Sequence, residues 1–101
     1  MTSAGCQLEG RADGTLAVRG VLTFDTAKAA WQSLRERLDR GGLQVLDLTA
    51  VEHSDSAGLA CVLAVLAEAG RRGRPPRVHG LPAGMRRLAQ VCEVESLLAT
   101  D

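Results

Sequence analysis

The spacing of apolar residues predicts two short strands near the start of the chain, at residues 6–9 and 15–19. In the second segment, Leu16 and Val18 alternate with smaller or charged neighbours, which is typical of a strand buried on one face. Residues 10–14 between the two segments combine glycine with aspartate, and turns favour both residue types. We therefore expect the two strands to form a hairpin.

Three later segments repeat their apolar residues at helical spacing. The first helix is expected to begin at a cap formed by Asp25 or Thr26 and to end near Arg40. The second is expected over residues 56–69, and the third from residue 81 onward. The expected buried positions are Ala27, Ala30, Trp31, Leu34 and Leu38 in the first helix, and Met85, Leu88, Ala89 and Cys92 in the third.

Between the first two helices, residues 43–48 are mostly apolar and show no consistent alternation. This pattern favours a strand covered on both faces, as in a parallel sheet with helices on either side. Residues 77–79 are expected to form a short last strand, and residues 94–99 a final helical turn that packs Leu97 and Leu98 against the body. A helix joins the second and third strands, so these two strands should be parallel. The predicted order is ββαβαβα, an α/β fold in which helices pack against a small sheet.

Length and composition are those of one globular domain spanning residues 1–101, with 46% apolar and 24% charged residues. A net charge of zero argues against nucleic acid as the main partner. No apolar run is long enough to cross a membrane, and residues 1–10 lack the pattern of a signal peptide, so we expect a cytoplasmic protein. The three cysteines are isolated, which argues against a disulfide framework or a metal site. Cys61 and Cys92 are expected to be core residues.

The second predicted helix carries almost no polar surface. Leu59, Val62, Leu63 and Leu66 form one apolar stripe, and most remaining positions are alanine, cysteine or valine. Two interpretations are open. Either the small residues remain exposed and form a patch that binds a protein partner, or the rest of the fold covers the helix on nearly all sides.

A polar cluster at residues 53–59, His-Ser-Asp-Ser-Ala-Gly-Leu, lies between a predicted strand and the second helix. Asp55 is placed to cap that helix, and Ser56 falls in its first turn, near the positive end of the helix dipole. A phosphate on Ser56, or an acidic group of a partner, would be favoured there. Gly58 has no side chain, so another surface could approach closely. The alternative is an ordinary helix cap that serves stability alone.

An apolar strand that leads into Asp55-Ser56-Ala57-Gly58-Leu59, the pattern D-S-x-G-L, within the order ββαβαβα resembles the STAS domain family. This family includes anti-sigma factor antagonists and cytoplasmic domains of anion transporters. It also includes the small STAS subunit of the ABC transporter that maintains outer-membrane lipid asymmetry, the Mla or toluene-tolerance system. The resemblance implies a STAS-type, SpoIIAA-like mixed sheet of four strands with helices packed against it, and a non-catalytic protein without a cofactor.

In the antagonists, the serine directly after the aspartate accepts a phosphate, and the turn and the helix after it bind the partner. The resemblance therefore implies that Ser56 is the phosphoacceptor candidate. The partner-binding surface that it implies consists of Ser54, Asp55, Ser56, Ala57, Gly58 and Leu59, with Cys61, Val62 and Val65 on the exposed flank of the helix.

Phospho-switched antagonists usually carry an acidic G-E-[IL]-D segment after the second strand, where this chain has Gly20-Val21-Leu22-Thr23. Our first hypothesis is therefore a subunit that binds and regulates the cytoplasmic ATPase of an ABC phospholipid transporter, at the inner face of the inner membrane through that partner. The alternative is an anti-sigma factor antagonist that binds an anti-sigma factor kinase and is switched by phosphorylation of Ser56. Catalysis is disfavoured, because the consecutive residues 53–56 cannot easily face one another as a triad must.

Overall fold

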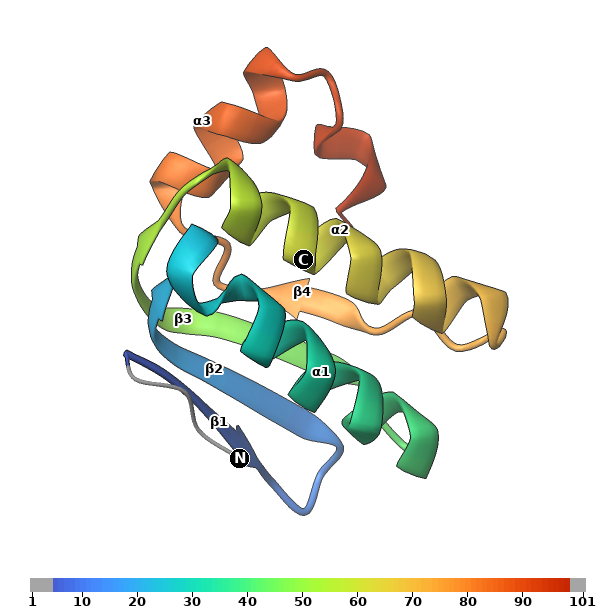
Figure 1. Cartoon of the computed structure of the whole chain (residues 1–101). Coiled ribbons are helices and arrows are strands. Elements are labelled where there is room, and N and C mark those ends of the chain that lie inside the picture. The colour runs from blue at the N-terminus through green and yellow to red at the C-terminus, as the bar shows by residue number, and fades with distance from the viewer. Residues whose placement is uncertain (1–4, 99–101) are drawn as a thin grey trace.

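The computed structural model describes residues 5–98, which form a four-stranded mixed sheet with helices packed against it (Figure 1). The order along the chain is the predicted ββαβαβα, followed by one short 3₁₀ turn. The elements are β1 (Cys6–Gly10), β2 (Thr15–Leu22), α1 (Phe24–Arg40), β3 (Val45–Ser54), α2 (Ser56–Arg71), β4 (Arg77–His79), α3 (Ala83–Val91) and the 3₁₀ turn η1 (Glu95–Leu97).

The strands lie in the order β1-β2-β3-β4. β1 and β2 form the predicted antiparallel hairpin, with Leu8 opposite Val18. β2 and β3 are parallel, as the crossover through a helix requires, and β4 adds a further parallel strand. The three parallel strands therefore all end at the same edge of the sheet, where α1 and α2 begin (Figure 1).

The sheet is covered on one face only, so the expectation that the third strand is covered on both faces is wrong. Helices α1 and α2 lie side by side across one face, and no described segment covers the other (Figure 1). Residues 43–48 include only Val45–Leu48 of β3, where Leu46 and Leu48 are buried and alternate with half-buried residues. Beyond them the strand continues to Ser54 through two register shifts against β2, with Val51 buried and its neighbours Ala50 and Glu52 exposed.

Helix α1 begins at Phe24, so the caps predicted at Asp25 or Thr26 are wrong. β2 continues to Leu22, which leaves Thr23 as the only residue between strand and helix and as the N-cap. The backbone N–H of Thr23 donates to the hydroxyl of Thr26 (3.0 Å), and that hydroxyl donates to the carbonyl of Val21 (2.8 Å). Thr26 is therefore a buried hydrogen-bonding residue of the first helical turn rather than the cap.

The core lies between the sheet and the helices, and the predicted apolar stripe of α1 faces it. Ala30, Leu34 and Leu38 are buried, while Ala27 and Trp31 are partly buried and pack against the core. The rest of the core comes from the inward positions of the strands, from α2 and from α3. Its buried apolar residues include Leu16, Val18, Leu22, Leu46, Leu48, Val51, Leu59, Val62, Val65, Leu66, Val78, Met85, Ala89 and Leu98.

Two positions near the end of the chain differ from the prediction. Cys92 is exposed, because α3 ends at Val91 and the chain then turns through Glu93, whose φ of 59° takes it out of the helical path. Leu97 is 61% exposed while its neighbour Leu98 is 3% exposed, since only one of two consecutive residues in this turn faces the core. The predicted final turn ends at Ala99, which lies outside the described residues.

Candidate functional site

The amino ends of α1 and α2 meet at one edge of the sheet, and Asp55 holds them together. One carboxylate oxygen, Oδ1, accepts hydrogen bonds from the N–H groups of Ala57 (2.9 Å) and Gly58 (3.1 Å), which confirms Asp55 as the cap of α2. The other oxygen, Oδ2, accepts from the N–H of Phe24 (3.0 Å), the first residue of α1. A single side chain therefore satisfies free N–H groups of two helices.

The same hydrogen bonds keep Asp55 ionised. The N–H of Phe24 lowers the pKa of the Asp55 carboxyl most, followed by the N–H groups of Gly58 and Ala57. The site therefore carries a fixed negative charge, and both carboxylate oxygens are already engaged by the backbone.

Ser56 is exposed and is the first residue of α2, as the sequence predicts for the phosphoacceptor candidate. Ser54, Asp55 and Ala57 lie half-buried on the same edge. Phe24 also lies at this edge and is 80% exposed, although sequence reasoning did not single it out. Its spacing from Ala27 is that of the buried stripe of α1, so no local signal marks it as exposed.

The missing side chain of Gly58 leaves room for a neighbouring strand inside the protein, not for an approaching partner. A Cβ atom at this position would lie well inside contact distance of the Leu22 carbonyl oxygen, 3.1 Å from the carbonyl carbon and 3.4 Å from the Leu22 Cγ. Gly58 and Leu59 are both buried, so neither contributes an exposed side chain to the expected binding surface. The surface that Gly58 allows to come close is the carboxyl end of β2 in the same chain.

The expected exposed flank of α2 is wrong. Cys61, Val62 and Val65 are 6%, 0% and 0% exposed, and they face the core. Each lies on the broad side of the helix that packs against the sheet, α1 and α3. The flank that is exposed consists of the alanines Ala60, Ala64 and Ala67 together with Ser56, while Leu63 is half-buried.

Within residues 5–98, no group of His, Cys, Asp and Glu side chains is arranged to hold a metal ion. None of the described helices combines the length and the apolar character needed to cross a membrane.

Residues 7–99 match the family model described as "Mlab, STAS domain", so the chain belongs to the STAS domain family. No curated protein matches the sequence. Several solved structures share the fold. An anti-sigma factor antagonist from Mycobacterium paratuberculosis is 22% identical, with a TM-score of 0.75 over 99% of this chain and 89% of that chain.

Two further structures are forms of the anti-sigma factor antagonist SpoIIAA. Its unphosphorylated form is 16% identical, with a TM-score of 0.72 over 95% of this chain and 87% of that chain. The phosphorylated form, described as a Bacillus cell fate determinant, is 17% identical, with a TM-score of 0.69 over 95% and 90%. At these identities the likeness shows the fold, and the STAS-type sheet predicted from the sequence is confirmed.

Proposed function

We propose that this protein is a non-catalytic regulator of the anti-sigma factor antagonist type, which binds a kinase-like protein partner through the edge formed by the amino ends of α1 and α2. The observation that carries this proposal is the position of Asp55. Its carboxylate accepts hydrogen bonds from the first turns of both helices, which brings Phe24 and Ser56, both exposed, to the same edge of the sheet. Structural neighbours described as anti-sigma factor antagonists, in phosphorylated and unphosphorylated forms, support the same interpretation.

Ser56 is the proposed switch because a phosphate there would meet an existing negative charge. Phosphorylation adds about −1.5 to −2 charges at neutral pH. Helix N–H groups normally neutralise such an anion, but Asp55 already accepts hydrogen bonds from the N–H groups of Ala57 and Gly58. The added charge would therefore remain at the surface beside an ionised carboxylate, where it would repel an acidic partner and expel an apolar one.

Phe24 is the proposed apolar anchor of this surface. Aromatic residues, Phe among them, are enriched in the buried cores of interfaces, and Phe24 is 80% exposed at the same edge as the switch residue. The alanines on the exposed flank of α2 add small apolar side chains to the surface that a partner could bury. A partner would thus bury one large side chain and a smooth helix face.

A binding measurement with variants tests this proposal. The candidate partner, a purified histidine-kinase-like ATPase of the anti-sigma factor type, is titrated with the protein in a calorimeter. Phe24→Ala and Ser56→Asp should each weaken binding by about tenfold or more, while Val91→Ala should leave it unchanged, because Val91 is 75% exposed on α3. Loss of binding in Val91→Ala, or wild-type affinity in both edge variants, would exclude this edge.

The kinase reaction itself gives a second readout. When the same ATPase is supplied with ATP, mass spectrometry should find the phosphate on Ser56, which is exposed, rather than on Ser54, which is half-buried at the end of β3. Phosphate on Ser54 alone would contradict the proposed switch.

The second candidate partner is the ATPase of an ABC phospholipid transporter, which would place the protein at the cytoplasmic side of the inner membrane. Two observations favour it: the description of the matching family model, and the segment Gly20-Val21-Leu22-Thr23 in place of an acidic one. The same calorimetric titration separates the two candidates. The transporter subunit would be favoured if the protein binds the transporter ATPase, if Phe24→Ala abolishes that binding, and if a phosphate on Ser56 leaves it intact.

A further inference from the structure

One face of the sheet is open and has no role in the proposed function. β2, β3 and β4 are parallel, and sheets built only of parallel strands are almost always covered on both faces. Here α1 and α2 cover one face, while Gln7, Arg19 and Glu52 on the other face are exposed. An uncovered parallel sheet suggests that a further layer is supplied from outside the chain.

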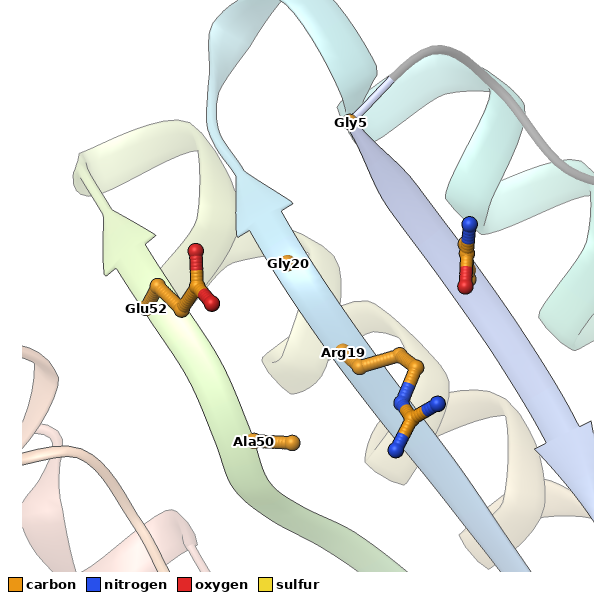
Figure 2. A pocket seen from close by; sticks show the side chains of 6 residues that line it. Gly5, Arg19, Gly20, Ala50 and Glu52 are labelled. Carbon is orange, nitrogen blue, oxygen red and sulfur yellow. The ribbon is translucent and has the colours of Figure 1, made fainter.

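A shallow hollow of about 370 Å³ lies in the middle of this face (Figure 2). Its floor carries almost no side chains, because it consists of Gly5, Gly20 and Ala50. Gly20 has a φ of 92°, and a Cβ atom there would run into the carbonyl oxygen of Gly5. The backbone conformation thus requires glycine here, so almost no side chain stands above the strands and another molecule can approach the sheet closely.

Two opposite charges lie on either side of this floor. Arg19 pairs in register with Ala50, and Glu52 follows two residues further along β3. Figure 2 shows the guanidinium of Arg19 extended towards β1 and the carboxylate of Glu52 at the other end of the hollow. Neither side chain makes an ion pair with another residue of the described part of the chain.

We propose that this face binds a second copy of the chain, with Arg19 of each copy paired with Glu52 of the other across the hollow. A face that carries one positive and one negative group is complementary to itself when a two-fold axis passes midway between them. The midpoint between Arg19 and Glu52 lies over the low floor at Gly20 and Ala50, so two copies can approach closely there. The net charge of zero removes long-range repulsion between copies.

The size of the face predicts a weak association. The four strands hold 26 residues in all, and at about 3.3 Å per residue and about 4.8 Å between strands they present on the order of 400 Å² per copy. The buried total is then about 800 Å², below the size of stable interfaces and typical of a weak, transient one. The dimer should therefore form at high protein concentration, independently of the edge that carries Ser56.

Sedimentation velocity of the full chain at about 10 µM to 1 mM and low salt tests this dimer. The wild type should shift from monomer to dimer over that range. Arg19→Glu and Glu52→Arg should each weaken the dimer by at least about tenfold, since each places like charges opposite one another. An equimolar mixture of the two variants should recover association, because one copy then carries two acidic groups and the other two basic ones. Arg35→Glu, on the exposed side of α1, is the matched control and should leave the equilibrium unchanged.

A thermal melt of each variant is the control that it is folded. A wild type that remains monomeric throughout the range would overturn the proposal. A mixture of folded variants that remains monomeric, or a control that weakens association as much as Arg19→Glu, would overturn it equally.

Discussion

At Gly58, α2 lies directly against the carboxyl end of β2, and we predict that Gly58→Ala destabilises the protein. The added methyl group would be directed at the backbone carbonyl of Leu22, which cannot rotate away as a side chain could. α2 would have to move outward, and the hydrogen bonds that join Asp55 to Gly58 and to Phe24 would lengthen.

The magnitude follows from two opposing effects. Inserting a methyl group into a packed interior costs about 1–3 kcal/mol, and a rigid backbone neighbour puts this site in the upper half of that range. Alanine is favoured over glycine within a helix by about 1 kcal/mol. The net result is a loss of about 1–2 kcal/mol, which lowers the melting temperature of a domain of this size by about 5–15 °C.

Gly70→Ala is the matched control, because Gly70 belongs to the same helix and a Cβ atom there meets nothing within 4 Å. Only the helix preference then acts, so this variant should gain about 0.5–1 kcal/mol. Thermal melts followed by circular dichroism measure both variants against the wild type.

The outcome that contradicts this reasoning is a Gly58→Ala variant as stable as Gly70→Ala. It would mean that α2 does not pack against the end of β2, and that Gly58 is free to serve an external surface as the sequence alone suggested.

Three further predictions concern single side chains. A thiol reagent at about pH 8 should label Cys92 quickly, and Cys6 and Cys61 only after unfolding. Cys6 and Cys61 are both buried, and burial raises the pKa of Cys61 to about 11. Mass spectrometry counts the labelled thiols, and rapid labelling of more than one would refute the burial. The backbone N–H groups lower the pKa of Asp55. The contribution of Asp55 to stability is therefore present above the unfolded pKa of about 4 and is lost as the pH falls through the folded pKa. Asp55→Asn should show a smaller loss of melting temperature on acidification than the wild type. Phe24→Ala should change the free energy of unfolding by less than about 0.5 kcal/mol, since the side chain is 80% exposed, and a large fall in melting temperature would show that Phe24 packs against the body instead.

The features that depend on neighbours in sequence could be predicted. The cap at Asp55 follows from a polar residue placed directly before an apolar helical run, and the structure has it there. The hairpin follows from turn residues between two short strands. The buried stripe of α1 was predictable as well, because charged residues such as Lys28 and Glu36 mark the opposite side of that helix.

The orientation of α2 could not be predicted in the same way. Between Ser56 and Glu68 the helix has no charged residue to mark an outer side. Small and apolar side chains are compatible with either side, so the burial of Cys61 and Val65 was decided by packing against the sheet, α1 and α3 together.

The sequence by itself determined the order of elements, the helix cap and the exposed serine that follows it, because these arise from contacts among near neighbours in the chain. Only the tertiary structure decided what surrounds them. The hydrogen bond from Phe24 to Asp55 joins residues 31 positions apart, and Gly58 meets the carbonyl of Leu22 from another element. Such contacts exist only after the strands have paired and the helices have docked, and no local pattern of residues encodes the distance between two helix ends.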